Sequence, residues 1–262
     1  MRPVYGVIAA NPMPYCRSLL RVSRCGSWCI LGRMDTALLD AVEINPVQPA
    51  RASIIWLHGL GADGHDFEPL IPQLDIVDRL GVRVVLPHAP RRPVTINAGM
   101  VMPAWYDVAA ADFSRGQDSE GIRASEVQLR ALIAREFTLG IPAERILLAG
   151  FSQGGAIVLY TGLRYPEPLA GILALSTYLP LAARLEAEMS PANRAIPIMM
   201  AHGTRDPVVP LHLAEQSRER LQQAGYQIDW HTYDMPHAVY PEEVTDIRRW
   251  LAQRLGPAAA PA

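Results

Sequence analysis

The sequence has 262 residues, of which 50% are hydrophobic and 19% charged, and a chain of this size and composition can bury one sizeable core as a single α/β domain. Its 24 basic residues are all Arg and face 26 acidic residues, which gives a net charge of −2 without a basic run interleaved with aromatics, so nucleic acid is not an expected partner. Because Lys is absent, P-loop phosphate binding and Schiff-base catalysis are excluded.

The first 33 residues differ from the rest of the chain, because they hold five Arg, no acidic residue and all three cysteines. Asn and Pro residues interrupt every apolar run there, so no cleavable signal is expected. We interpret residues 1–33 as an extension, disordered or upstream of a true start at Met34, and residues 34–262 as the catalytic domain. A domain without Cys cannot use disulfides, which favours a reducing, cytoplasmic location. Cys25 and Cys29 lack a nearby His, so no metal is expected.

Six short apolar or β-branched runs, bounded by Gly, Pro or other turn residues, predict β-strands. They lie at residues 53–57, 82–86, 146–149, 171–175, 198–201 and 227–233. Helical spacing of apolar residues predicts helices at 121–137 and 244–255. Alternating apolar strands and helices indicate an α/β fold with a mostly parallel central sheet and helices on both faces. No run is long and apolar enough to span a membrane.

The carboxyl ends of parallel strands are where ligands bind in such sheets. After the strand that ends at Ala149, the residues Gly150-Phe151-Ser152-Gln153-Gly154 fit G-x-S-x-G and lead into an apolar helix. A strand that turns sharply into a helix strains the central residue and requires small neighbours. Ser152 is therefore the candidate nucleophile; the alternative is a glycine-rich turn with an incidental serine.

A serine nucleophile needs a general base, and in α/β hydrolases the base and its carboxylate follow the serine in the chain. Four histidines qualify: His202, His212, His231 and His237. Only His237 lies in a loop between the last predicted strand and the last predicted helix. On these positional grounds we predict His237 as the base.

The acid that orients this base is expected in a loop at the same edge of the sheet. Asp206, in the turn Thr-Arg-Asp-Pro after the strand at 198–201, fits this place. Asp206 could instead merely begin the turn, and Asp234 could serve as the acid. Asp229 falls within a predicted strand and fits less well.

A tetrahedral intermediate needs two backbone N–H donors, one after the nucleophile and one from the loop that follows an earlier strand. Gln153 and Leu60 occupy those places. Three glycines in residues 58–64 permit the close approach of backbone to substrate. His58 is interpreted as a packed structural residue rather than a catalytic one.

Substrate walls are expected from the long loop at residues 91–118. Met102, Trp105 and Tyr106 are the predicted substrate-binding residues, although Trp105 could equally pack the loop against the sheet. The 53 residues between Ser152 and Asp206 are already filled by predicted elements, so no large cap domain fits and the site should be open.

Several further motifs accompany the elbow: His-Gly-Leu-Gly-Ala-Asp-Gly from position 58, Leu-Pro-His-Ala-Pro-Arg-Arg-Pro from 86, Met-Pro-Ala-Trp-Tyr-Asp from 102 and Leu-Ser-Thr-Tyr-Leu-Pro from 175. With these, residues 39–255 resemble the carboxylesterase/acyl-protein thioesterase family, in the phospholipase/carboxylesterase branch of the α/β hydrolases. The resemblance implies the triad Ser152, Asp206 and His237, the oxyanion donors Leu60 and Gln153, and no cofactor or metal. A homodimer is a family-level expectation.

The predicted function is a serine carboxylesterase that hydrolyses short- to medium-chain acyl esters through an acyl-enzyme. The substrate is then a small-molecule ester or an acylated molecule. An acyl-protein thioesterase or a lysophospholipase on the same site is the alternative. A catalytically silent binding protein on this fold is a remote third.

Overall fold

The computed structural model describes residues 38–110 and 116–256. The chain divides into the units Met1–Asp35 and Thr36–Ala262, and every described element belongs to the second. Residues 1–33, predicted as an extension, lie outside the described residues, so the domain boundary at Met34 stays a prediction.

Nine strands and seven α-helices are described, joined by short 3-10 turns. The strands are β1 (Ala41–Ile44), β2 (Ala52–Leu57), β3 (Val82–Pro87), β4 (Arg91–Val94), β5 (Met100–Pro103), β6 (Ile146–Phe151), β7 (Gly171–Leu175), β8 (Ile198–Gly203) and β9 (Ile228–Tyr233). The α-helices are α1 (Ile71–Leu74), α2 (Val77–Leu80), α3 (Ser119–Thr138), α4 (Gln153–Arg164), α5 (Leu185–Glu188), α6 (Leu211–Gln223) and α7 (Pro241–Leu255). The 3-10 turns are η1 (Gly64–Leu70), η2 (Thr95–Asn97), η3 (Ala143–Arg145), η4 (Ala182–Arg184) and η5 (Pro191–Asn193).

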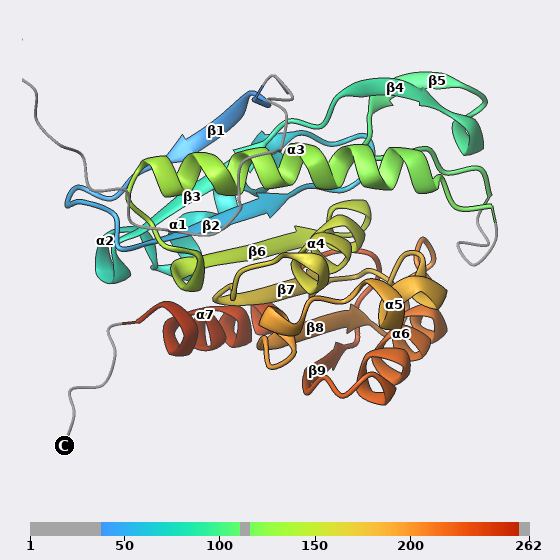
Figure 1. Ribbon diagram of the computed structural model, residues 1–262. Helices are drawn as coiled ribbons and strands as arrows, with labels where there is room; N and C mark the ends of the chain where they lie inside the picture. The colour runs from blue at the N-terminus through green and yellow to red at the C-terminus, as the bar shows by residue number, and fades with distance from the viewer. Residues whose placement is uncertain (1–37, 111–115, 257–262) are drawn as a thin grey trace, which may run out of the picture. The chain divides into compact units, whose positions relative to one another are not determined.

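Seven strands form the central sheet in the order β1-β3-β2-β6-β7-β8-β9 (Figure 1). All neighbouring pairs are parallel except β1 with β3. The mostly parallel sheet predicted from the sequence is confirmed, and each of the six predicted strands corresponds to a strand of this sheet. Because the last five strands in that order run in the same direction, the loops after β6, β8 and β9 meet at one edge.

Both faces of the sheet are covered. Alternate strand residues, such as Ile55, Leu148 and Met200, pack on one face against a core that includes side chains of α3 and α4. The intervening residues, such as Trp56 and Leu147, pack on the other face against α1, α2 and α7. This alternation follows from the two-residue period of a strand, and it gives the sheet two separate apolar layers.

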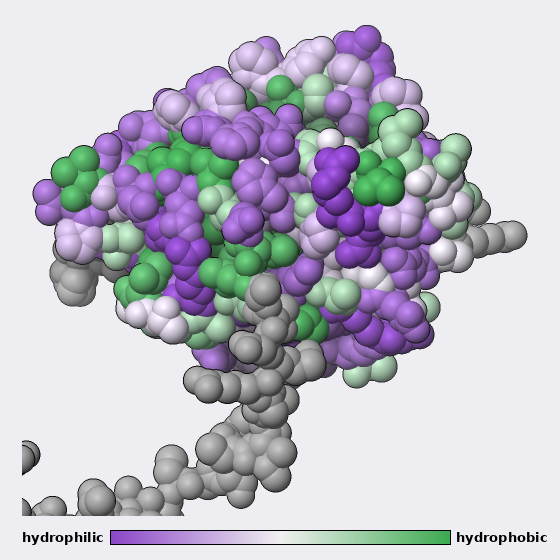
Figure 2. Space-filling model, turned by 90° about the horizontal axis from the view of Figure 1, so that it is seen from above, coloured by the Kyte–Doolittle hydropathy of each residue, from purple (hydrophilic) through white to green (hydrophobic). Residues whose placement is uncertain are grey.

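The two predicted helices bury the expected faces. Ile122, Leu129, Leu132 and Ile133 of α3 are at most 1% exposed. The apolar side chains of α7 that recur with helical spacing are also buried. The outer side of the molecule, uppermost in Figure 1, mixes hydrophilic and hydrophobic residues over short distances (Figure 2), as expected for helices with one buried face.

Two strand regions escape the sequence pattern. Strand β1 has only four half-buried residues and is the one antiparallel edge strand; it is tied to the sheet by Glu43, which pairs with Arg83 of β3 at 2.7 Å. The segment 91–118, predicted as a long loop, instead contains the antiparallel hairpin of β4 and β5. The hairpin contains Pro and exposed residues, which are atypical of a buried strand, so its sequence does not show a recognisable strand pattern.

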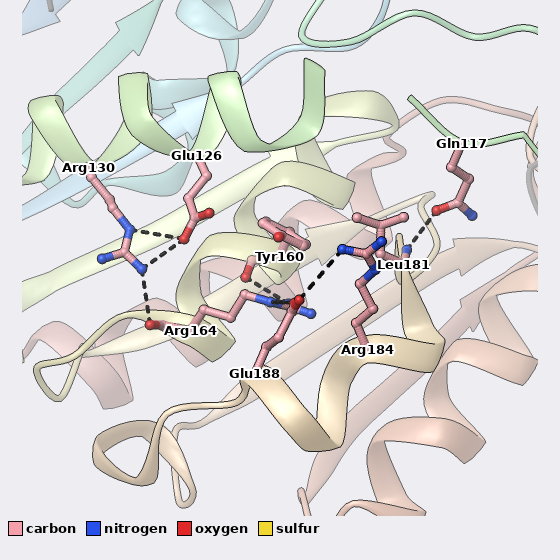
Figure 3. A network of polar contacts seen from close by, with 8 residues as sticks. All are labelled: Gln117, Glu126, Arg130, Tyr160, Arg164, Leu181, Arg184 and Glu188. Atoms are coloured by element: carbon pink, nitrogen blue, oxygen red, sulfur yellow. Dashed lines mark hydrogen bonds and ion pairs between the residues drawn. The ribbon is translucent and has the colours of Figure 1, made fainter. Parts of the chain in front are cut away.

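A polar network fastens the segment after β7 to the helices (Figure 3). Arg130 of α3 donates to the Arg164 carbonyl at 3.1 Å, and Arg164 in turn donates to Glu188 of α5 at 2.8 Å. The Leu181 N–H donates to Gln117 at 2.7 Å. These contacts fix the chain that runs between β7 and β8, and they therefore stabilise one side of the edge where the site lies.

Candidate active site

Ser152 stands between the end of β6 and the beginning of α4, at the tip of a sharp turn. Its backbone has φ 54° and ψ −120°, a conformation that costs energy for a residue with a Cβ. The Ser152 N–H donates to the carbonyl of Leu175 at 2.8 Å, which holds the turn against β7. The strained turn predicted from G-x-S-x-G is confirmed.

The two glycines of the motif allow this turn to pack. A Cβ on Gly150 would lie 2.5 Å from the carbonyl carbon of Gly154, and a Cβ on Gly154 would collide with the carbonyl oxygen of Leu57. Both hypothetical contacts are far closer than van der Waals distance. Strands β6 and β2 and helix α4 can therefore approach one another this closely only because Gly150 and Gly154 have no side chain.

His237 and Asp206 are hydrogen-bonded to each other. His237 Nδ1 lies 2.6 Å from Asp206 Oδ2. Asp206 follows β8, and His237 lies in the loop between β9 and α7, so neighbouring parallel strands bring the pair together. The contact assigns the ring proton to Nδ1 and leaves Nε2 free to accept a proton.

The Asp206 carboxylate is buried and fully engaged. Its other oxygen accepts from the N–H groups of Val208 and Val209 at 2.8 and 2.9 Å. Burial alone would raise the pKa of Asp206, but the hydrogen bonds from His237 and from the two N–H groups outweigh burial and lower that pKa. The carboxylate is therefore held ionised next to the imidazole.

Two residues support this pair in roles that the sequence did not reveal, although His202 was considered as a candidate base. His202, at 1% exposure, bonds through Nε2 to the Val209 carbonyl at 2.8 Å and so braces the Asp206 loop; burial lowers its pKa. A Cβ on Gly203 would lie 2.5 Å from the Pro236 carbonyl oxygen, so this glycine lets the His237 loop pass. A His at the end of a buried strand, followed by Gly, is the signal for both.

The alternatives weighed for acid and base have other partners. Asp234 pairs with Arg205 at 2.5 Å and its side chain is 83% exposed. Asp229 accepts from His231 Nε2 at 2.9 Å. His212 lies on α6. Although Arg205 adjoins Asp206 and Asp234 lies in the loop that holds His237, none of these contacts involves the side chain of Asp206 or His237.

The nucleophile turn and the histidine loop lie side by side. The ring of Phe151, directly before Ser152, is 4.6 Å from the His237 ring between centroids. A Cβ on Gly59 would lie 3.4 Å from Ser152 Cβ, so the glycine-rich loop after β2 lies against the serine. The edge of the sheet therefore gathers the serine turn, the Asp206 and His237 pair, and the loop that holds Leu60.

The geometry of that loop is set by His58. The Ala89 N–H donates to His58 Nε2 at 3.0 Å, so Nδ1 carries the proton and donates to the Gly59 carbonyl at 2.8 Å. Burial lowers the pKa of His58, which agrees with a neutral ring. The Gly59 carbonyl and the Leu60 N–H belong to one trans peptide, so the Leu60 N–H points away from His58.

Two of the three predicted substrate-binding residues are buried and pack beneath the site. Trp105 and Tyr106 are 1% and 2% exposed. The Trp105 indole donates to the His58 carbonyl at 2.8 Å, while the Gln153 side chain accepts from the Trp105 N–H and donates to the Tyr106 carbonyl. Met102 is half-buried, with its sulfur 3.7 Å from a Cβ position at Gly61. Contact with substrate stays a prediction for all three, and Met102 is the best exposed.

A cleft of about 380 Å³ opens beside His237, between its loop and the segment that follows the glycine-rich loop. Within residues 38–110 and 116–256, no cluster of three or more His, Cys, Asp or Glu side chains could hold a metal ion. In the same ranges, no helix combines the length and apolarity that crossing a bilayer requires.

Residues 40–255 match the phospholipase/carboxylesterase family. The chain belongs to this family. Family membership agrees with the α/β hydrolase fold and with the arrangement at the edge of the sheet, and it identifies the protein as an ester hydrolase.

Relatives within the family include acyl-protein thioesterase 1 of Neurospora crassa, which is 44% identical over 78% of this chain and 87% of its own length. Acyl-protein thioesterase 1 of Gibberella zeae is 39% identical over 79% of this chain and 92% of its own. The crystal structure of acyl-protein thioesterase 2 of Zea mays superposes with a TM-score of 0.75 at 30% identity, covering 83% of this chain and 99% of that one.

Proposed function

We propose that the protein hydrolyses carboxylic acyl esters with Ser152 as nucleophile, His237 as general base and Asp206 as the acid that orients it. The observation that carries the proposal is the hydrogen bond between Asp206 and His237, formed beside the strained turn that presents Ser152. A serine hydroxyl is a weak nucleophile unless a base takes its proton, and this arrangement supplies the base in the required tautomer.

In the first half-reaction, Ser152 Oγ attacks the ester carbonyl while His237 Nε2 takes the hydroxyl proton. The ionised Asp206 stabilises the imidazolium that forms. The negative charge on the carbonyl oxygen is met by the N–H groups of Leu60 and Gln153, the second of which lies at the N-terminus of α4, where negative charge is favoured. The carbon–oxygen bond to the alcohol then breaks, and His237 gives its proton to the leaving oxygen.

In the second half-reaction, water takes the place of the alcohol. His237 removes a proton from the water, the hydroxide attacks the acyl carbon, and the proton returns to Ser152 as the acid is released. Between Ser152 and Asp206 the chain holds α4, β7, α5, β8 and short 3-10 turns, which leaves no room there for a large cap domain. This openness supports turnover of esters with bulky alcohols and of short to medium acyl chains.

A second candidate is the hydrolysis of acyl thioesters. It is favoured by the names of the relatives in Neurospora crassa and Gibberella zeae, both acyl-protein thioesterases. The same residues would serve, because attack on a thioester carbonyl also passes through a tetrahedral oxyanion. Hydrolysis of a lysophospholipid is the third candidate activity of the same site. Homodimer formation, the absence of a nucleic-acid partner and a cytoplasmic location stay predictions.

The test is a profile of kcat/KM for matched oxygen esters and thioesters across acyl lengths from two to sixteen carbons, together with a lysophospholipid. The proposal expects the highest kcat/KM for an oxygen ester of short or medium length, and a burst of alcohol equal to the enzyme concentration. A maximum at long-chain thioesters would favour the second candidate. No turnover of any substrate would reject both and favour a silent binding protein.

A further inference from the structure

The cleft beside His237 is the feature that the proposed mechanism leaves unused. It is bounded by η1, α1, the end of β6 and the loop after β9. Its lining includes Asp66, Phe67, Leu70, Phe151, His237 and Val239. The base itself therefore forms part of the wall of this cleft.

The chemistry of the site assigns an occupant to this cleft, if the proposed function holds. His237 must give a proton to the leaving atom when the acyl bond breaks. That atom must therefore lie within hydrogen-bond reach of His237, and the remainder of the leaving group must extend from it into adjoining space. A cleft of about 380 Å³ is large enough for a small alcohol or for one side chain of a peptide.

The walls are suited to a cation. Phe67 and Phe151, whose ring centroids lie 5.8 Å apart and which also pack on Trp56 and His237, give the cleft an apolar wall next to the base. Asp66 adds a carboxylate at the rim, where it is exposed and forms no ion pair with any described residue. No Arg stands among the residues that line the cleft.

The chain segments around the cleft are also rich in acidic residues. Residues 58–78 contain five carboxylates and no Arg, and residues 234–247 contain four carboxylates and no Arg. Much of this charge is already balanced: Glu68 pairs with His65, Asp75 with Arg79, Asp234 with Arg205 and Asp246 with Arg249. Burial raises the pKa of Glu243 to about 8, so this residue adds no charge at neutral pH. Asp66 remains the unbalanced carboxylate on the cleft wall.

We propose that this cleft binds the leaving group, and that Asp66 on its wall makes the enzyme prefer leaving groups that carry a positive charge a few atoms from the scissile bond. Such leaving groups include amino alcohols and thiols or alcohols on basic peptides. Anionic leaving groups, phosphate-bearing ones among them, are disfavoured by the same field.

The test compares three butanoyl esters that share an acyl group. The first is the choline ester, and the second is its uncharged carbon isostere, in which a tert-butyl group replaces the trimethylammonium group. The third carries a sulfonate at that position. At low ionic strength, kcat/KM should be about three to ten times higher for the choline ester than for the isostere, and lower than the isostere by a similar factor for the sulfonate.

Asp66→Asn should bring the ratio of choline ester to isostere toward one, and Asp66→Arg should invert it. The matched control is Glu144→Gln, because Glu144 is also exposed but lies before β6, at the opposite end of that strand from Ser152. This control should keep the native ratio. Added salt should reduce the native preference, since exposed charges are screened.

Equal kcat/KM for the three esters would overturn the proposal, as would a ratio that Asp66→Asn and Asp66→Arg leave at the native value. Both results are compatible with the proposed function, because the neutral isostere is still turned over. Failure to hydrolyse any of the three, isostere included, would overturn the proposed function and this inference with it.

Discussion

Asp206 Oδ2 lies 2.6 Å from His237 Nδ1, while Asp206 Oδ1 accepts two backbone N–H groups. The carboxylate is thereby fixed on both sides, and it can orient the ring without rotating away. This contact explains why one aspartate among several nearby can act on the base.

Asp206→Asn should remove the acceptor that selects the Nδ1–H tautomer. We expect kcat for a neutral ester to fall about 10⁴-fold, by analogy with the same change in serine proteases. Asp234→Asn is the control, because Asp234 pairs with Arg205 at the surface, and it should stay near the native rate. Equal losses in the two variants would contradict the role given to Asp206.

His58→Ala should disturb the Leu60 N–H, since His58 fixes the peptide that carries it. Loss of one oxyanion donor costs about 10²–10³ in kcat, so a fall toward that range is expected, with a smaller change in KM. His58→Asn keeps a side-chain N–H in a similar place and should recover part of the rate. Steady-state kinetics on one ester measures both effects. A rise in KM with unchanged kcat would contradict the role of His58 in positioning the Leu60 N–H.

Trp105→Phe removes the indole donor to the His58 carbonyl. A buried carbonyl that loses its partner costs about 1–3 kcal/mol, so the melting temperature should drop. The order of preference among acyl chain lengths should not change, because Trp105 is 1% exposed. A shifted chain-length optimum in this variant would show that the indole contacts the acyl group after all.

Glu243→Gln should change how stability depends on pH. Glu243 is fully buried, and neither carboxylate oxygen makes a hydrogen bond of normal geometry with the described residues. Burial raises the pKa of Glu243 to about 8, and the nearby Tyr240 backbone offsets only part of that rise. The folded state therefore holds this proton more tightly than the unfolded state, so its contribution is complete below the ordinary pKa and disappears as pH rises through about 8.

Chemical denaturation at a series of pH values from 5 to 9 measures this effect. Native protein should lose a few kcal/mol more than Glu243→Gln across the series, at about 1.4 kcal/mol for each tenfold change in proton affinity. Glu242→Gln, an exposed neighbour on the same helix turn, should behave as native. Parallel pH curves for native protein and Glu243→Gln would show that Glu243 does not titrate in this way.

Much of the architecture follows from sequence pattern. The buried strands β2, β3, β6, β7 and β8 are continuous apolar runs, and α3 and α7 have clear apolar faces, so their period alone identifies them. The strands β1, β4 and β5 have four residues each and half-buried or exposed patterns. Strand β1 pairs with the distant β3, and β4 pairs with β5 across a short connection, but none of the three shows an apolar pattern that identifies a strand from sequence.

Some residues of the site could likewise be predicted from the sequence, and others could not. Ser152 could be found because its turn imposes glycines at fixed spacing, and Asp206 and His237 because their loops follow neighbouring strands. The supporting roles of His202 and Gly203 depend on contacts with Val209 and Pro236. Such contacts arise from tertiary packing, and the local sequence shows only that a His and a Gly end a buried strand. For Trp105, the structure shows a packing role through burial and the hydrogen bond to the His58 carbonyl, which composition alone could not show, while substrate contact stays a prediction.

The central claim is that Ser152 forms a covalent acyl-enzyme. The direct measurement is intact-protein mass spectrometry after treatment with a fluorophosphonate ester, followed by peptide mapping. We predict one adduct per chain, located on Ser152, with matching loss of esterase activity and no adduct in Ser152→Ala. Full esterase activity in an unlabelled protein, or in Ser152→Ala, would contradict it.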